Sequence, residues 1–265
     1  MSADGRPGAS HQNWADLTSP TLGGAISRDP VAVVPIGSVE QHGRHLPVGT
    51  DAFAAEAIAR GAASRWTAEQ PLLLLPTLWT GLSPHHMGLP GSLTLRTSTF
   101  IDVVQDVCTS LLHHGVRRIV LLNGHGGNSS ALDVVLARLG EQGLPVERVA
   151  VVTYWHLVAH RTSEFRDTRH GGTGHAGEFE TSLMLATHEQ LVKEDAEVCY
   201  PKLPSDYLST DLFAAGLAKR YVAFDRLSET GTLGDPSAAS ADKGRRILIA
   251  CSEELHAFLT DFASW

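Results

Sequence analysis

The sequence predicts an α/β fold, a three-layer α/β/α sandwich around a mostly parallel sheet. Apolar, β-branched strand candidates alternate along the chain with segments of helical periodicity, the pattern of sheets covered by helices on both faces. The strand candidates are continuously apolar, as expected for strands that are buried on both sides. The length of 265 residues and the apolar content of 43% suit one large core. We therefore expect a single domain over residues 30–265.

The N-terminal third of the chain illustrates the pattern. Residues 1–29 are rich in Gly, Ser, Pro and Asn, so we expect a flexible arm with one short helical turn over 14–17. The apolar run 31–36 predicts the first buried strand. A loop with several Gly and Pro residues follows over 37–51, and an alanine-rich helix follows it over 52–63.

The later elements repeat this alternation. Apolar runs predict three more strands, at 72–75, 117–122 and 149–155. Helical spacing, with cap residues and terminal glycines, predicts further helices over 97–114, 129–142, 178–187 and 243–262. Pro and Gly interrupt the segment 195–242, where we expect loops around one short helix over 211–218.

Charge and cysteine content exclude several classes of protein. The formal net charge of -8 argues against a nucleic-acid-binding surface and against adhesion to anionic membranes. The three cysteines are odd in number and widely spaced, so they form neither a disulfide framework nor a cysteine zinc site. We expect no secretion leader and no membrane span, because the first residues lack an apolar segment and no run is long enough. A cytoplasmic protein that acts on a small molecule or a peptide fits these features.

Metal-ligating side chains gather in three connectors that end a strand or open a helix. Glu40, His42 and Asp51 follow the first strand, His125 follows the third, and Glu178 opens a later helix. The carboxyl ends of parallel strands lie at one sheet edge, where ligands bind in open α/β folds. A single histidine in a loop is most often a surface residue, so the convergence of three connectors carries the argument.

These five residues predict a catalytic rather than a structural metal site. Three carboxylates and two imidazoles exceed what a closed tetrahedral zinc site uses, which indicates two metals that share a carboxylate and leave positions open for water. Zinc, manganese and iron all accept this ligand set. The alternative is a metal-binding or ligand-binding protein without catalysis on the same scaffold.

Three ordered motifs resemble the creatininase (creatinine amidohydrolase) family, over roughly residues 30–255. The motifs are residues 35–43 with 45–47 and 50–51, residues 123–128, and residues 175–182. The resemblance implies a creatininase-like fold and a binuclear, metal-dependent hydrolase of amide C–N bonds. It implies that Asp51 bridges the metals, that Glu40 and His125 hold one of them, and that His42 holds the other.

The sequence departs from creatininase proper at Gly127, where that branch carries a metal-binding glutamate. Glu178 stands where creatininase proper has no carboxylate, so we expect Glu178 to supply the missing metal ligand and to take part in catalysis. We expect Glu180 to orient a neighbouring ligand or to form a structural ion pair, and not to bind metal itself. By the same resemblance, His175 lies beside the substrate and donates a proton to the leaving nitrogen.

Further expectations concern the substrate and the assembly. We expect substrate contacts from Ser83, His86, Trp155 and His175, with Trp155 placed over the pocket by the resemblance. The substrate is expected to be a cyclic amide, a formamide or a short peptide. The resemblance also implies two divalent metal ions per chain, with zinc as the first expectation and manganese or iron as alternatives, and a homo-oligomer of six subunits.

Overall fold

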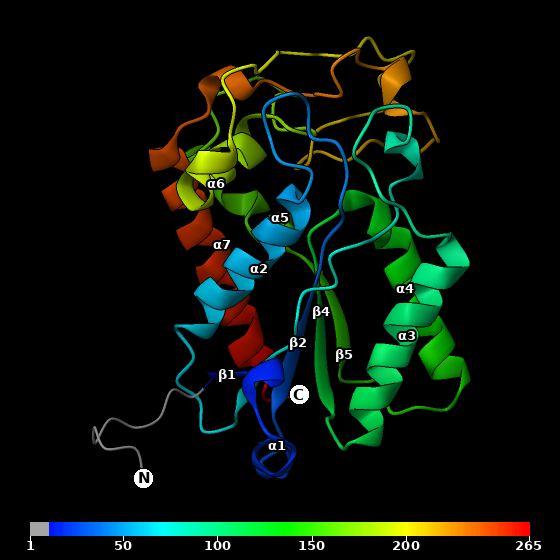
Figure 1. Ribbon diagram of the computed structural model, residues 1–265, viewed down its shortest axis with the longest axis vertical. Coiled ribbons are helices and arrows are strands. Elements are labelled where there is room, and N and C mark those ends of the chain that lie inside the picture. Colours follow the sequence, from blue (N-terminus) through cyan, green and yellow to red (C-terminus); the bar gives the residue numbers. More distant parts are fainter. Residues whose placement is uncertain (1–10) are drawn as a thin grey trace.

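The computed structural model describes residues 11–265, and its centre is a five-stranded parallel sheet (Figure 1). The strands follow the order β1-β3-β2-β4-β5 across the sheet, and each pair is parallel. Their bounds are β1 His11–Asn13, β2 Val31–Ile36, β3 Leu72–Leu74, β4 Arg118–Asn123 and β5 Val149–Thr153. The predicted α/β sandwich with a mostly parallel sheet is therefore confirmed.

Helices cover both faces of this sheet (Figure 1). One face carries α2 Thr50–Ala63, α5 Tyr154–Leu157, α6 Glu178–Thr187 and α7 Ala241–Phe262. The other face carries α3 Thr97–His113 and α4 Ser129–Glu141. Because every residue of β2 and β4 is buried, both faces of the central strands pack against apolar side chains. Five predicted helices are present within two residues of their expected ends, namely those over 52–63, 97–114, 129–142, 178–187 and 243–262.

The register of the two central strands brings their following loops together. β2 and β4 pair from Val31 opposite Arg118 to Ile36 opposite Asn123, so both strands end at the same level. The amide of Gly124 then donates a hydrogen bond to the carbonyl of Ile36 at 2.8 Å. The loops that were expected to hold metal ligands therefore start side by side at the carboxyl edge.

Glycine is required where α2 begins against this edge. A Cβ atom on Gly37 would lie 2.4 Å from the Cα of Ala52, a distance that real Cβ atoms do not show. The missing side chain lets the first turn of α2 approach the end of β2. That close approach carries Asp51 back toward the loop that follows the strand.

The N-terminal arm is more ordered than expected. Residues 11–13 form β1, which pairs with Leu72–Leu74 at the sheet edge, and α1 spans Ser19–Ile26. Where the sequence predicts a flexible arm with one helical turn, residues 11–29 thus contain a strand, a 3₁₀ turn at Trp14–Asp16 and a helix, and residues 1–10 lie outside the described residues. The sequence of β1 is His-Gln-Asn, so it carries no apolar signal from which a strand could be predicted.

The long aperiodic segment after α6 also differs from the expectation. Residues 211–218 form no helix, because the carboxylate of Asp211 accepts hydrogen bonds from its surroundings and holds an irregular loop. Its donors are Arg166, the amides of Gly171 and Phe213, and the hydroxyl of Thr173. A short 3₁₀ turn at Phe224–Arg226 lies further along this segment. Among residues 11–265, no helix is both long and apolar enough to cross a membrane.

Candidate metal centre

Four of the five predicted ligands meet at the carboxyl edge of the sheet. Glu40 and His42 lie in the loop after β2, Asp51 lies in the first turn of α2, and His125 follows β4. All four side chains are buried, with at most 4% of their surface exposed. Three groups of residues bring their ligand atoms close enough to hold a metal: Glu40, Asp51 and His125; His42, His175 and Glu180; and Glu40, His86 and His175.

Asp51 lies at the centre of this arrangement. Its Oδ1 is 3.1 Å from Nε2 of His42, and its Oδ2 is 3.0 Å from Nδ1 of His125. Nδ1 of His125 also lies 3.2 Å from Oε2 of Glu40. The two oxygens of one carboxylate thus face two different imidazoles.

Second hydrogen bonds fix the rings of both imidazoles. Nδ1 of His42 is 3.1 Å from the carbonyl oxygen of Glu40, and Nε2 of His125 is 3.0 Å from the carbonyl oxygen of Leu82. A carbonyl only accepts, so these nitrogens carry the protons of the neutral rings. The opposite nitrogens then turn lone pairs toward the carboxylates, as metal-binding histidines do.

The donor set passes a direct test for a divalent metal. Nε2 of His42 and Oδ2 of Asp51 are buried, and neither has a hydrogen-bond partner within residues 11–265. A lone pair of a neutral imidazole facing a carboxylate at about 3 Å is repulsive unless a proton or a cation lies between them. Mixed nitrogen and oxygen ligands suit zinc, manganese and iron.

The charges of the centre shift its pKa values strongly. Burial alone lowers the pKa of His42, but the charge and hydrogen bond of Asp51, with Glu180 and Glu40, raise it to about 10. Against the same effect of burial, Glu40 and Asp51 raise the pKa of His125 well above its ordinary value. Burial, with the charge of Asp51, raises the pKa of Glu180 to about 7 against the opposing effect of His42. Without metal, therefore, protons occupy part of the space between these acceptors.

Of the two glutamates of α6, Glu180 and not Glu178 lies in a candidate ligand group. Oε1 of Glu180 lies 3.9 Å from Nε2 of His42, and Oε2 accepts the amide of Ala176 at 2.6 Å. Residues two apart on a helix point about 200° apart, so Glu178 faces away from His42 when Glu180 faces it. Glu180 therefore takes the place that the sequence analysis gave to Glu178.

The carboxylate of Glu178 is fully engaged elsewhere. It accepts hydrogen bonds from the amides of Asp167 and Thr168 at 2.9 and 3.0 Å and from the Thr168 hydroxyl at 2.6 Å. It also forms a buried ion pair with Lys243 of α7. Because its oxygens are held by a cation and three donors, Glu178 anchors α6 to its neighbours and joins none of the three ligand groups.

Gly127 has no space for the side chain that creatininase proper carries there. A Cβ atom at this position would lie 2.3 Å from the carbonyl oxygen of Leu82 and 2.4 Å from Nε2 of His125. The hydrogen bond between His125 and Leu82 thus occupies the volume that a side chain would need. A side chain here would therefore require the loop or the ring of His125 to shift.

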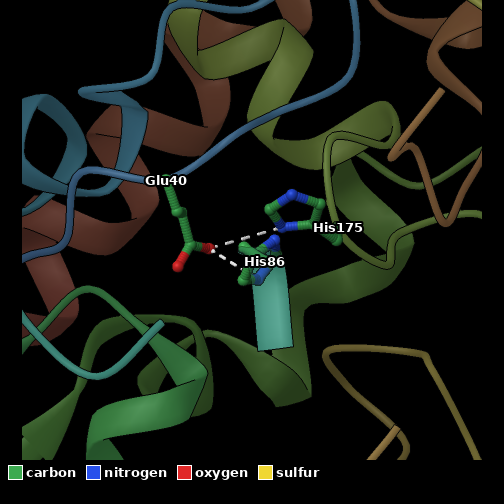
Figure 2. Close-up of side chains that lie close together, drawn as sticks. All are labelled: Glu40, His86 and His175. Atoms are coloured by element: carbon green, nitrogen blue, oxygen red, sulfur yellow. Dashed lines mark ion pairs between the residues drawn. The ribbon is translucent and has the colours of Figure 1, made fainter. Parts of the chain in front are cut away.

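His86 and His175 lie next to each other, and both face Oε1 of Glu40 (Figure 2). Nε2 of His86 is 3.2 Å from Oε1 of Glu40, and Nδ1 of His175 is 3.7 Å from the same oxygen. Burial, followed by the charges of neighbouring histidines, lowers the pKa of both rings, so both are neutral near pH 7. Phe224 covers them, with ring centroids 4.1 Å from His86 and 5.2 Å from His175.

The other two expected substrate contacts, Ser83 and Trp155, are also buried. The hydroxyl of Ser83 donates to Oε2 of Glu40 at 2.5 Å and is fully buried, so it holds a candidate ligand in place. Trp155 is 4% exposed and packs in the core on the α7 side, with its ring 5.0 Å from that of Tyr154. Substrate contacts by Ser83 and Trp155 remain predictions.

Three residues near the centre were missed by the sequence analysis. Gln41 lies between two candidate ligands, Glu40 and His42, and this position in the motif could have identified it as a residue of the site. Lys243 is separated from Glu178 by 65 positions, and Phe224 lies in an aperiodic segment. Neither of these two has a local sequence signal, because tertiary structure alone places it there.

Comparison with known proteins agrees with this geometry. The family model for creatininase, described as creatinine amidohydrolase, matches residues 15–259. The chain belongs to the creatininase family. Creatinine amidohydrolase of Pseudomonas putida is 33% identical to this family member over 84% of this chain and 86% of its own length. The mycofactocin precursor peptide peptidase of Mycobacterium tuberculosis is 31% identical over 90% and 88%. The names of both relatives describe hydrolases that act on C–N bonds, and this chain is a hydrolase of the same family.

Solved creatininases have the same fold. A mutant creatininase described as Zn-Zn type superposes with a TM-score of 0.76 and 29% identity, covering 94% of this chain and 97% of that one. A creatininase described as containing Mn gives a TM-score of 0.76 and 30% identity with the same coverage. A more distant relative, 3-dehydro-scyllo-inosose hydrolase of Thermotoga maritima, is 26% identical over 86% of this chain and 76% of its own length.

Proposed function

We propose that this protein hydrolyses an amide C–N bond in a small molecule or a short peptide with two divalent metal ions. One observation carries the proposal: the two oxygens of Asp51 each face a ring nitrogen of a different imidazole, Nε2 of His42 at 3.1 Å and Nδ1 of His125 at 3.0 Å. A carboxylate between two sets of ligands is the arrangement of a shared, binuclear centre.

In this proposal the ligands divide into two sets around Asp51. Glu40 and His125 complete one set, and His42 and Glu180 complete the other. Neither set is a closed cage of four protein ligands, so positions remain for water and substrate. When bound there, divalent metals supply a water of lowered pKa and a positive charge for the carbonyl oxygen of the amide.

His175 is the proposed residue for proton transfer. Its Nε2 is 2.6 Å from the carbonyl oxygen of Gln41 and must donate to it, which leaves a lone pair on Nδ1. Nδ1 can therefore accept the proton of the attacking water and then deliver it to the leaving nitrogen. The ring of His86 lies 4.5 Å from that of His175 between centroids, and Phe224 packs against both.

The named relatives set the range of substrates to be tested. Among them are a creatinine amidohydrolase and a peptidase of a precursor peptide, and a creatininase has been solved as a complex with creatine. We retain cyclic amides, formamides and short peptides as candidate substrates.

A homo-oligomer of six subunits also remains a proposal, which light scattering at micromolar concentration tests.

The decisive experiment measures metal and activity together. Protein stripped with a chelator and protein reloaded with zinc, manganese or iron should be assayed on a panel of lactams, formamides and short peptides. We expect hydrolysis only after reloading, with about two metals per chain by elemental analysis. Asp51→Asn should lose both metals and the activity. Two retained metals in Asp51→Asn, or equal activity of the stripped protein, would contradict the proposal.

A further inference from the structure

Gln41 contacts both of the imidazoles that lie beside Glu40. It lies between Glu40 and His42 in the loop after β2 and is 4% exposed. Its side-chain Nε2 is 2.8 Å from Nδ1 of His86, and its backbone carbonyl is 2.6 Å from Nε2 of His175. One residue thus contacts both rings, once through its side chain and once through its main chain.

Two backbone groups fix the orientation of the Gln41 amide. The N–H of Gly43 donates to Oε1 at 3.0 Å, and Nε2 donates to the carbonyl oxygen of Gly231 at 3.2 Å. If the amide oxygen and nitrogen were exchanged, the NH₂ group would face the N–H of Gly43 and the oxygen would face the carbonyl of Gly231, so both hydrogen bonds would be lost. Gly231 has φ +88, and a Cβ there would meet Oε1 of Gln41, so glycine permits this close approach.

This orientation determines the proton position on His86. The amide nitrogen can only donate, so Nδ1 of His86 must accept from it. The proton of the neutral ring then lies on Nε2, which is 3.2 Å from Oε1 of Glu40. His86 therefore presents an N–H to the carboxylate.

The main-chain carbonyl of Gln41 determines which nitrogen of His175 carries the proton. A backbone carbonyl only accepts, so Nε2 of His175 carries the proton. The side-chain contact of 3.2 Å between Nε2 of Gln41 and Nε2 of His175 joins two donors and is not a hydrogen bond. Nδ1 of His175, the ring nitrogen nearest to Glu40 (Figure 2), consequently carries no proton.

We propose that Gln41 is a positioning residue that makes His86 a hydrogen-bond donor to Glu40 and keeps Nδ1 of His175 free to accept a proton. The two rings carry their protons on the same atom but face Glu40 with opposite ends. The assignment of proton transfer to His175 rests on the proposed function, whereas the two ring states rest on hydrogen bonding alone.

Nitrogen NMR of the histidine rings tests the assignment in the zinc-loaded, full-length protein. Spectra of His86→Asn and His175→Asn identify the two rings. In the unsubstituted protein, both should show a protonated Nε2 and an unprotonated Nδ1. A protonated Nδ1 on His86 would overturn the proposal even if every Gln41 variant failed to fold.

The matched variants are Gln41→Glu and, as a control in α3, Gln105→Glu. A carboxylate cannot donate, so Nδ1 of His86 should gain a proton in Gln41→Glu, while His175 keeps its state because its partner is a backbone carbonyl. Gln105→Glu should change neither ring. An unprotonated Nδ1 on His86 in Gln41→Glu would contradict the inference.

Activity separates this inference from the proposed function. With an amide substrate in hand, Gln41→Glu should lower kcat with both metals retained and with a smaller change in KM. Absence of amide hydrolysis with the expected ring states would refute the proposed function alone. Intact hydrolysis with a different state of His86 would refute the role of Gln41 alone.

Discussion

Glu178 and Glu180 lie two positions apart in the first turn of α6, yet their surroundings are opposite. Glu178 meets a lysine, two backbone amides and a hydroxyl, all of which donate to it. Glu180 meets one backbone amide and the side of His42 that faces Asp51. A buried carboxylate that has its own cation and donors is stable as it is, whereas one that lies among other acceptors needs a cation.

The difference shows that proximity in sequence to a ligand motif does not decide which acidic residue joins a candidate ligand group. The identity of the neighbours decides it. Lys243 neutralises one glutamate from another helix, and no cationic side chain of the described residues is paired with Glu180 apart from the histidine. Substitutions at these two positions should therefore have different consequences.

Glu180→Gln should have the largest effect on function. The amide keeps the hydrogen bond from Ala176 but removes the charge that faces His42. We expect loss of one metal per chain and a fall in activity of more than about 100-fold, above the cost typical of an outer-shell partner. Elemental analysis of the purified protein measures the number of metals per chain. As the control for folding, the metal-free variant should melt at the same temperature as the metal-free unsubstituted protein.

Glu178→Gln should act mainly on stability. It leaves the buried Lys243 with only the exposed Asp167 as a charged partner, and breaking a buried pair costs about 3 kcal/mol. For a chain of this size that corresponds to a fall in Tm of roughly 6–12 °C.

The expected metal content of Glu178→Gln is unchanged, and Glu178→Met combined with Lys243→Met should recover part of the loss. Calorimetry and metal analysis of the same samples decide between the two glutamates. A variant that melts like the unsubstituted protein but has lost a metal would restore Glu178 as the ligand.

Gly127→Ala sharpens the comparison from the opposite side of the centre. Its Cβ would collide with the carbonyl of Leu82 and the ring of His125, so we expect a loss of about 1–3 kcal/mol. Gly126→Ala is the matched control, because nothing lies within 4 Å of its Cβ position. Denaturant unfolding measures the free energy of unfolding of both variants.

Because of the same collision, Gly127→Glu should not restore the metal that Glu180→Gln loses. A recovered second metal in that double variant would show that the loop can rearrange.

The smallest expected signal is the proton exchange that accompanies metal binding. The pKa of His42 is raised to about 10, so its contribution to the stability of the metal-free protein is complete below pH 6.5 and is lost as pH rises toward 10. Metal binding must displace this proton, so metal affinity should rise with pH over the same interval. Calorimetric titration at neutral pH in buffers of different ionisation enthalpy should report release of at least about one proton per chain. Glu180→Gln, which lacks one charge, should release fewer.

The part of the centre that sheet geometry builds could be predicted from the sequence. Glu40, His42 and His125 follow predicted strands, and parallel strands deliver their following loops to one edge, so the convergence of these residues with Asp51 follows from the strand pattern. The fold class followed from the same alternation of strands and helices.

The rest depended on long-range neighbours. Choosing Glu180 over Glu178 requires the position of Lys243, and the order of residues 11–13 depends on pairing with Leu72–Leu74. The loop around Asp211 is shaped by donors some 40 positions earlier in the chain. Local propensity has no access to such partners.

The position of Asp51 between two imidazoles also has a thermodynamic consequence. In the proposed binuclear centre, two ions that share this carboxylate cannot bind independently, so occupancy of either side changes the dissociation constant of the other by some factor. Linkage requires that factor to be the same in both directions. A chelator that removes the more weakly held ion will therefore alter the affinity of the ion that stays, and dissociation constants measured one side at a time will depend on the loading order.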